Sequence, residues 1–321
     1  MKKLDQDLPF LKIDLHIHSY YSFRTSEKMS FDQIILAAQE KKLDIIGTGD
    51  ILHDWWQQEV LLYLNSKIPL KRSIKVLLTA EIVDKNGIHL ILVFSRIKVV
   101  ELTRKIFSKF SNTLNKNGRP FIRLDLFEII KILPKGVYLG LAHVFQKIIG
   151  YYHRYDSILK IKKDILFVET GQDGDYSFAR SIKDLKGVAI VNFSDAHGLE
   201  TLGRAYIVMP LIRSFKELIC NFKKKLFITV SPFRGYGKFY GQGKTKSLLE
   251  RTSKLESKMI FREHFATIPL KKRKNTSFTK WLLVKFLTKE LFSHKNINYS
   301  YKIKEGKDNV YGKICWLKKL K

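Results

Sequence analysis

The sequence predicts an α/β fold in which a mostly parallel sheet closes into a barrel and is covered by helices. Apolar runs alternate with amphipathic segments in six or seven units over the first 230 residues. Many of these runs are uninterrupted, which is typical of strands buried on both faces. Side chains able to bind metals directly follow the runs, and α/β barrels build their active sites at the carboxyl ends of the strands.

The first predicted strand, 13–18, alternates apolar and polar residues. This period of two places His16 and His18 on the same face of the strand. Two neighbouring buried imidazoles are costly unless their lone pairs are used, most commonly by a bound metal. For this pair alone, hydrogen bonds to neighbouring carbonyl groups are an equally open alternative.

The other elements follow from apolar periodicity and from helix start and stop signals. Ser30 is a typical N-cap residue, and Pro134 ends the helix that precedes it. Helices are predicted at 31–42, 54–64, 99–115, 124–133, 177–185 and 211–225. Strands are predicted at 43–47, 74–83, 88–94, 137–142, 165–168, 188–193 and 205–209.

The composition changes after residue 230, which divides the chain into a barrel domain at 1–230 and a basic module at 231–321. The module has 23 Lys and Arg residues against 6 Asp and Glu, and it opens with a glycine-rich, linker-like stretch at 235–244. A further helix is predicted at 278–292. The basic and aromatic side chains expected to contact nucleic acid are Lys271, Lys272, Arg273, Lys274 and Trp281. For this cluster alone, a solvated basic subdomain is the alternative.

The whole chain has a net charge of +29, which favours a polyanionic partner, with nucleic acid the first choice. Biased codon usage is an alternative source of the charge. No apolar run is long enough to cross a membrane, and no signal peptide is recognisable. With only two cysteines, we expect a cytoplasmic protein without a disulfide framework. No protein partner is identifiable.

Histidines and acidic residues gather at or beside the predicted strand ends. They are His16, His18, Asp50, His53, Glu81, His89, His143, Asp195 and His197. Imidazole and carboxylate ligands without thiolates suit Zn, Mn or Fe. So many ligands exceed the needs of one ion, so we expect two or three divalent ions, with a carboxylate such as Glu81 bridging them. Such a cluster activates water near neutral pH and stabilises the displacement at a phosphoester.

Several separated blocks of the sequence, in the same order, resemble the polymerase and histidinol phosphatase (PHP) superfamily of metal-dependent phosphoesterases. Within this superfamily, the residues of these blocks are most similar to those of the endonuclease Q family of DNA-repair nucleases. The blocks lie at 14–19, 25–29, 47–50, 79–82, 168–171, 194–197 and 202–204. The resemblance covers roughly residues 9–230 and implies a distorted (β/α)7 barrel with a trinuclear metal site.

The resemblance also implies roles for individual residues. The implied metal ligands are His16, His18, Asp50, Glu81, His89, His143, Asp195 and His197. Asp195 and Glu81 would hold the cluster for catalysis. Arg204 would hold a phosphate or form a structural salt bridge. His53 would be a further ligand, a substrate contact or a surface histidine at a helix start. Glu169 would orient a ligand imidazole.

The sequence departs from the family pattern at three places, one of which is the stretch 144–147 after His143, where the family has aromatic and proline residues. Phe23 stands where many superfamily members carry an acidic residue, seven positions after the first histidine. Only Cys315 occurs after residue 231, so the cysteine-rich zinc module of endonuclease Q is absent from this chain. The specificity of the family for particular damaged bases is therefore not transferred to this chain.

Three functions remain in view. The first is a metal-dependent endonuclease that acts on DNA, at deaminated or damaged bases. The second is a phosphatase of a small phosphorylated metabolite, and the third is a non-catalytic nucleic-acid-binding protein. The charge of +29 favours the nuclease over the phosphatase, and the intact set of candidate ligands argues against the third function.

Overall fold

The computed structural model describes residues 10–66, 74–146, 148–171, 179 and 182–230, together with the backbone of three later strands at 261–269, 298–305 and 309–317. None of the described helices is both long enough and apolar enough to span a lipid bilayer.

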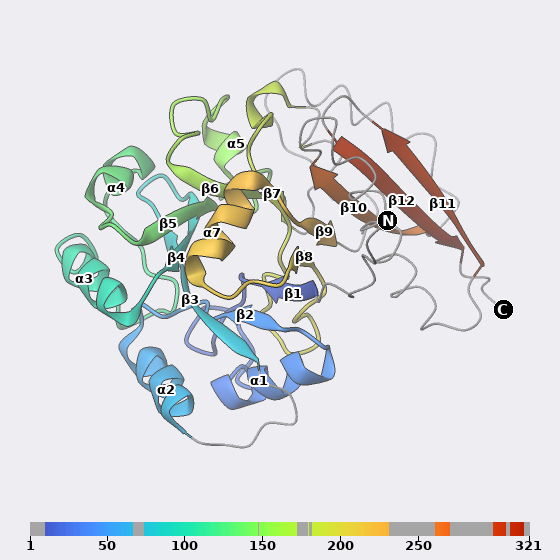
Figure 1. The fold of residues 1–321 in the computed structure, drawn as a ribbon. Coiled ribbons are helices and arrows are strands. Elements are labelled where there is room, and N and C mark those ends of the chain that lie inside the picture. Colours follow the sequence, from blue (N-terminus) through green and yellow to red (C-terminus); the bar gives the residue numbers. More distant parts are fainter. Residues whose placement is uncertain are drawn as a thin grey trace.

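The first nine strands form one sheet in the order β7-β6-β5-β4-β3-β2-β1-β8-β9 (Figure 1). In chain order they are β1 (Phe10–Asp14), β2 (Ile45–Gly47), β3 (Lys75–Val83), β4 (His89–Phe94), β5 (Val137–Leu141), β6 (Ile165–Glu169), β7 (Ile190–Val191), β8 (Tyr206–Pro210) and β9 (Ile228–Val230). Every strand predicted up to residue 209 overlaps an observed strand. The first was predicted too late in the chain: β1 ends at Asp14, so His16 and His18 follow the strand and do not lie within it.

The prediction of a mostly parallel sheet was wrong. Pairs β1–β2, β2–β3, β5–β6 and β6–β7 are parallel, whereas β3–β4, β4–β5, β1–β8 and β8–β9 are antiparallel. The reason is visible between β3 and β4, where Asp84 accepts hydrogen bonds from the backbone of Asn86 and Ile88, both at 2.8 Å. So short a turn reverses the chain and has no room for the crossover helix that a parallel pair needs.

The sheet nearly closes into a barrel. The hydroxyl of Thr229 in β9 donates to the carbonyl of Ile190 in β7 at 3.1 Å, which joins the two ends of the strand order. Beyond β1, Ile17 forms a parallel bridge with Ala196. The expected barrel-like sheet is therefore confirmed in outline, with nine strands in the described part of the chain.

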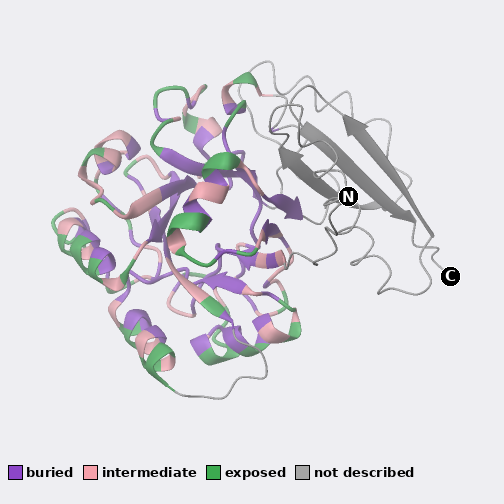
Figure 2. Cartoon of the chain, in the orientation of Figure 1, coloured by how far each residue is buried: buried purple, intermediate pink, exposed green. Residues whose placement is uncertain are grey.

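Helices cover the outer side of this sheet, and their exposed faces point away from it (Figure 2). They are α1 (Phe31–Glu40), α2 (Asp54–Asn65), α3 (Ile97–Phe107), α4 (Leu126–Ile132), α5 (Tyr151–Arg154), the 3-10 turn η1 (Lys183–Leu185) and α7 (Phe215–Lys224). The predicted helix at 99–115 was too long. It ends at Phe107, and Thr113 in the following loop donates its backbone N–H to the Ser111 hydroxyl, because such side chains compete with helical hydrogen bonding.

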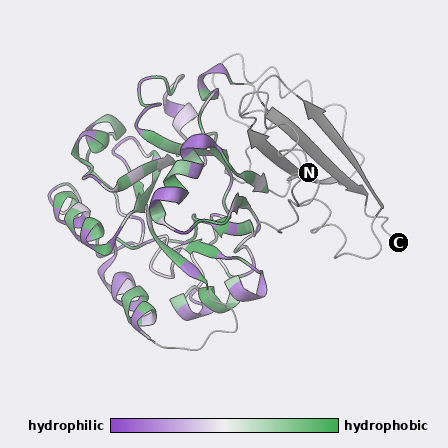
Figure 3. Cartoon of the chain, in the orientation of Figure 1, coloured by the Kyte–Doolittle hydropathy of each residue, from purple (hydrophilic) through white to green (hydrophobic). Residues whose placement is uncertain are grey.

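Two apolar clusters hold the barrel together. The larger lies between the sheet and helices α1 to α4. The smaller combines Ile13 of β1, Val93 of β4, Phe167 of β6 and Ile207 of β8 with Phe222 of α7. These strands are far apart in the strand order, so they share a cluster because the sheet curves around it. Figure 3 accordingly shows mostly hydrophobic residues along the strands, while the helices have both hydrophobic and hydrophilic residues.

Past residue 230, strands β10 (Phe261–Pro269), β11 (Asn298–Glu305) and β12 (Asn309–Leu317) form an antiparallel sheet in the order β10-β12-β11. The predicted linker at 235–244, the helix at 278–292 and most of the helix at 177–185 lie outside the described residues. So do the five residues from Lys271 to Trp281 expected to contact nucleic acid.

Candidate metal centre

The barrel strands deliver the predicted ligands to one place. His16 and His18 follow β1, Asp50 follows β2, Glu81 lies in β3 and His89 begins β4. The remaining members follow or end β5, β6 and β7: His143, Glu169, Asp195 and His197. Antiparallel β3 and β4 contribute side chains from the same end of the sheet, because Glu81 near the end of β3 lies beside the start of β4.

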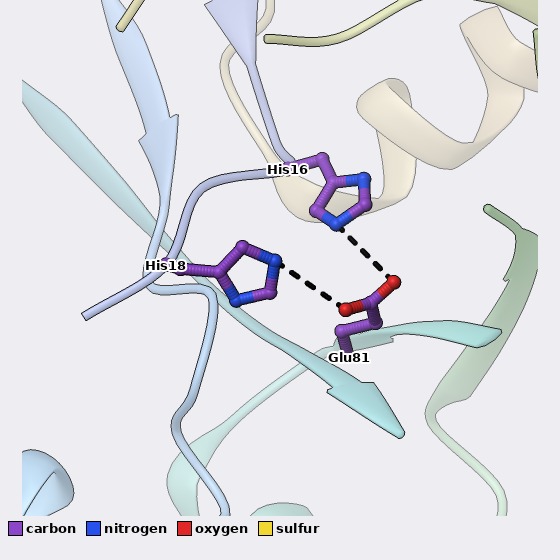
Figure 4. A group of neighbouring side chains, drawn as sticks. All are labelled: His16, His18 and Glu81. Carbon is purple, nitrogen blue, oxygen red and sulfur yellow. Dashed lines mark ion pairs between the residues drawn. The ribbon is translucent and has the colours of Figure 1, made fainter. Parts of the chain in front are cut away.

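Glu81 is at the centre of this cluster. Its Oε1 lies 3.5 Å from Nε2 of His16, and its Oε2 lies 3.3 Å from Nε2 of His18 (Figure 4). The same carboxylate lies 2.8 Å from Nδ1 of His89 and 3.1 Å from Nε2 of His143, both through Oε1. One buried carboxylate therefore contacts four imidazoles, as a bridging ligand would.

Asp195 forms the second centre, at the more exposed side. Its Oδ1 lies 3.4 Å from Nε2 of His16 and 3.3 Å from Nε2 of His18. The ring of His197 packs against that of His18, with centroids 4.4 Å apart. The side chains of Asp195 and His197 are 14% and 30% exposed, whereas His16, His18 and Glu81 are fully enclosed, so the mouth of the cluster lies on the side of Asp195 and His197.

Within the described residues, these side chains form three groups able to hold a metal ion. The groups are His16, His18 and Glu81; His18, Asp195 and His197; and Glu81, His89 and His143. In each group the ligand atoms lie within 4.8 Å of one another, and His18 and Glu81 each belong to two groups. Shared members of this kind are what a cluster of adjacent ions requires.

The donor atoms themselves fit divalent ions. Nε2 of His16, Nε2 of His18 and Oδ1 of Asp195 are buried and make no hydrogen bond to the described residues. Buried polar atoms without partners are costly and rare in folded proteins. Since these atoms converge and are of the types that Zn, Mn and Fe prefer, the site could hold such ions.

Two carboxylates set the orientation of the first two imidazoles. Glu169 lies 2.8 Å from Nδ1 of His16 and is itself held by the backbone N–H of Phe193 at 3.2 Å. Asp50 lies 3.2 Å from Nδ1 of His18, while its other oxygen accepts from Ser19 and Ser22. Both contacts leave Nε2 of the ring to face the cluster.

These placements distinguish Asp50 from the other predicted ligands. Asp50 is buried, but it belongs to none of the three ligand groups, and both of its oxygens contact protein atoms. Glu169 likewise lies behind His16, in the orienting position that the sequence suggested. The structure thus brings all eight predicted ligands together and puts Asp50 behind His18.

The charges of the cluster shift the pKa values of its members. Burial acts against a protonated imidazole, but the carboxylates of Asp50, Asp195 and Glu81 outweigh it and raise the pKa of His18 to about 10. Glu169, Asp195 and Glu81 raise the pKa of His16 in the same way, against its burial. Burial dominates at His89 and lowers its pKa to about 4. Metal ions bind imidazole in its neutral form, so at His16 and His18 they would compete with protons.

The loop that carries Asp195 and His197 is fixed by charged side chains. The ammonium group of Lys41 donates to the carbonyls of Leu199, Glu200 and Leu202 at 2.7, 2.8 and 2.7 Å. Buried Asp14 accepts from the backbone N–H groups of Ser194 at 3.1 Å and Gly203 at 3.0 Å. These contacts hold both ends of the segment 194–203.

The remaining predicted residues have structural contacts. Arg204 donates from Nε to the carbonyl of Ser194 at 2.7 Å, so it supports the loop of Asp195, and a phosphate contact for it stays a prediction. His53 caps α2, accepting from the backbone of Trp56 at 3.4 Å, and stacks on Tyr21 with centroids 4.2 Å apart. It is a helix-start histidine, as one alternative held, but it is buried and lies outside the three ligand groups.

Sequence reasoning missed one residue of the cluster. Arg119 donates from a terminal guanidinium nitrogen to Oε2 of Glu81 at 2.9 Å. It lies in the loop between α3 and α4, far along the sequence from every strand end, so only the folded chain reveals its contact. Phe23, at the position of the missing acid, is 63% exposed and lies beside the guanidinium of Arg24.

Comparison with known proteins finds one curated relative of unknown function and solved structures that share the fold. No family model matches the chain. An uncharacterized protein of Methanocaldococcus jannaschii is 36% identical over 132 residues, which are 41% of this chain and 16% of that protein.

Two solved structures share the fold. The lesion-specific endonuclease Q of Pyrococcus furiosus superposes with a TM-score of 0.66 at 27% identity, over 76% of this chain and 66% of that one. An endonuclease Q bound to a 27-mer duplex with an abasic lesion at its active site superposes with a TM-score of 0.63 at 28% identity, over 75% of this chain and 67% of that one. The chain thus spans about two thirds of these nucleases, to which it is structurally related.

Proposed function

We propose that this chain is a metal-dependent endonuclease that cuts DNA at deaminated or damaged bases. The observation that carries the proposal is the pair of carboxylates, Glu81 and Asp195. Both lie 3.3–3.5 Å from the buried Nε2 atoms of His16 and His18, which make no hydrogen bond to the described residues. The residues fit two or three divalent ions of Zn, Mn or Fe. When bound, these ions would activate a water molecule and stabilise negative charge on the phosphate.

The side chains have separate roles in this proposal. Glu81 bridges the ligand groups, and Asp195 with His197 completes the group nearest the mouth. Glu169 and Asp50 hold the imidazoles of His16 and His18 in the tautomer that leaves Nε2 free for a ligand bond. Because the cluster is buried except at Asp195 and His197, a phosphodiester would approach from that side.

The comparisons support DNA as the substrate. Both solved relatives are endonuclease Q proteins, and one was solved with a duplex that carries an abasic lesion at the active site. A phosphatase acting on a small metabolite would use the same metals, but it has no need of a net charge of +29. The choice of damaged base is part of the proposal.

The basic module at 231–321 belongs to the same proposal. Its 23 basic and 6 acidic residues suit the DNA backbone, and Lys271–Lys274 with Trp281 combine phosphate-binding charge with a base-stacking ring. We expect replacing Lys271, Lys272, Arg273 and Lys274 by glutamine to weaken DNA binding and to flatten its dependence on salt concentration. An unchanged salt dependence would remove this part of the proposal.

The experiment for the whole proposal uses end-labelled duplexes that carry uracil, hypoxanthine, an abasic site or no lesion. Wild-type protein loaded with Mn²⁺ should nick the damaged strand beside the lesion, and D195N should reduce the rate by at least about 100-fold. E101Q, on the exposed face of α3, is the matched control and should cut normally. Turnover of a small phosphate ester with no cleavage or binding of DNA would contradict the proposal and favour the phosphatase.

A further inference from the structure

Among the described residues, Arg119 is the only arginine or lysine that forms an ion pair with Glu81. Its guanidinium donates to Oε2 of that carboxylate at 2.9 Å, on the same oxygen that lies 3.3 Å from Nε2 of His18. The side chain of Arg119 is 19% exposed, while Glu81 is 1% exposed. Arg119 therefore contacts the enclosed carboxylate while part of its side chain remains exposed to solvent, as parts of Asp195 and His197 do.

The loop that carries Arg119 is built to hold it there. The backbone N–H of Gly118 donates to the carbonyl of Tyr21 at 3.1 Å, and that of Val83 donates to the carbonyl of Pro120 at 3.0 Å. A Cβ atom at Gly118 would lie 2.5 Å from Oδ2 of Asp50, so the loop presses directly on the cluster. The backbone on each side of Arg119 is therefore held by one hydrogen bond to a neighbouring segment.

Divalent ions would change the balance of charge around Arg119. The cluster contains four carboxylates, those of Asp50, Glu81, Glu169 and Asp195. Two or three divalent ions equal or exceed this negative charge, and as a bridging ligand Glu81 would give both oxygens to them. A guanidinium beside such a site loses its anionic partner and meets positive charge, so it is stabilised only by an added anion.

We propose that Arg119 is the residue that binds the phosphate of the substrate, and that metal loading releases it from Glu81 for this purpose. A guanidinium presents a planar fork of N–H donors that matches two phosphate oxygens. In the metal-free chain, Arg119 occupies the place of a cation on Glu81 and so competes with the ions. This inference rests on the proposed function, since it assigns the substrate contact of the same site.

The proposal predicts different effects of losing Arg119 on metal binding and on phosphate binding, whereas a purely structural role predicts the same effect on both. If Arg119 only supported Glu81, its loss would weaken metal binding and phosphate binding together. If it competes with the ions and then binds phosphate, its loss leaves metal affinity equal or stronger and weakens phosphate binding alone.

The test is calorimetric titration of the full chain, first with Mn²⁺ and then, after loading, with inorganic phosphate. For R119Q we expect Mn²⁺ affinity at least equal to that of wild type and phosphate affinity lower by about tenfold or more, the scale of a lost charge-assisted pair. R119K keeps the charge without the planar fork and should lose less. R123Q is the control, because exposed Arg123 lies in the same loop and donates to the Lys109 carbonyl.

Three results would overturn the inference: R119Q with phosphate affinity within about twofold of wild type, R119Q with weakened Mn²⁺ binding, or loaded wild type that binds no phosphate. Thermal unfolding of each variant checks that it is folded. If R119Q is unfolded, the Mn²⁺ and phosphate affinities of R119K are the test instead. Should loaded wild type bind phosphate through Arg119 and yet cut no DNA, the endonuclease proposal fails while this inference stands.

Discussion

Glu169 accepts a hydrogen bond from His16 at 2.8 Å, although 153 positions separate the two residues in the chain. The contact fixes the proton on Nδ1 of His16 and turns Nε2 toward Glu81 and Asp195, 3.5 and 3.4 Å away. A carboxylate behind a metal-binding imidazole determines both the ring orientation and the basicity of the ligand nitrogen.

The first prediction follows from this contact. In E169Q the amide oxygen would accept from the backbone N–H of Phe193, so the NH₂ would face Nδ1 of His16 and leave the proton on Nε2, the atom that must bind metal. We expect Mn²⁺ affinity to fall by about 10- to 100-fold while the thermal unfolding midpoint changes little. Titration calorimetry measures it against E101Q, an exposed control on α3. Unchanged affinity in E169Q would mean that His16 does not depend on this contact.

The second prediction concerns pH and the metal-free chain. The pKa of His18 is raised to about 10 and that of His16 well above 6.5, in each case because nearby carboxylates outweigh burial. Their contribution to stability is therefore complete below about pH 6.5 and is lost as the pH rises toward 10. With a chelator present, the thermal midpoint should fall between pH 6.5 and 9.

Metal-loaded protein is the control for this titration. There the imidazoles bind ions in their neutral form, so raising the pH removes no proton and the midpoint should stay level or rise. Parallel pH curves with and without metal would show that these histidines do not bind the ions.

The third prediction tests the support of the loop at 194–203. K41M removes the ammonium group that three backbone carbonyls share, at 2.7 to 2.8 Å. We expect it to cost about 1 kcal/mol in the free energy of unfolding. Metal affinity should also fall, because Asp195 and His197 lie in this loop. Urea unfolding and Mn²⁺ titration measure both, with K105M on the exposed face of α3 as the control. Wild-type values for both quantities would show that the loop holds its shape without Lys41.

The fourth prediction concerns Gly49, which lies between the segment of His18 and the strand of Glu81. Its φ is +76°, and a Cβ atom there would lie 1.9 Å from the carbonyl oxygen of Ile17. G49A should therefore destabilise the fold by at least about 3 kcal/mol and separate the metal ligands. Gly187 has a φ of +88° with nothing within 4 Å of the added Cβ, so G187A isolates the backbone strain, about 1 kcal/mol. Equal losses in the two variants would contradict the steric explanation.

The ligand cluster could be predicted from the sequence because the pattern that marks each ligand is local. Each of His16, Asp50, His143 and Asp195 lies within a few residues after the end of an apolar run, and strand ends meet at one edge of a sheet. The sequence could not show which carboxylate belongs to a ligand group and which one orients a ligand imidazole. Asp50 and Glu81 look alike in sequence, yet the serine donors around Asp50 direct it to the back of His18.

Other features depend on contacts distant in the chain. Arg119 reaches Glu81 only because the loop after α3 folds back over β3, and no periodic pattern marks that loop. The antiparallel course of β4 was readable in principle, since four residues separate the predicted strands at 74–83 and 88–94. A turn that short excludes a crossover helix, so it indicates an antiparallel pair of strands.

The central claim is that several ions occupy the cluster around Glu81 and Asp195, and the metal content of the purified chain tests it most directly. Elemental analysis after loading with Zn²⁺ or Mn²⁺ and removal of excess metal should give two or three ions per chain. E81A, which removes the member shared by two ligand groups, should retain at most one. Less than one ion per wild-type chain, or the same content in E81A, would contradict the account.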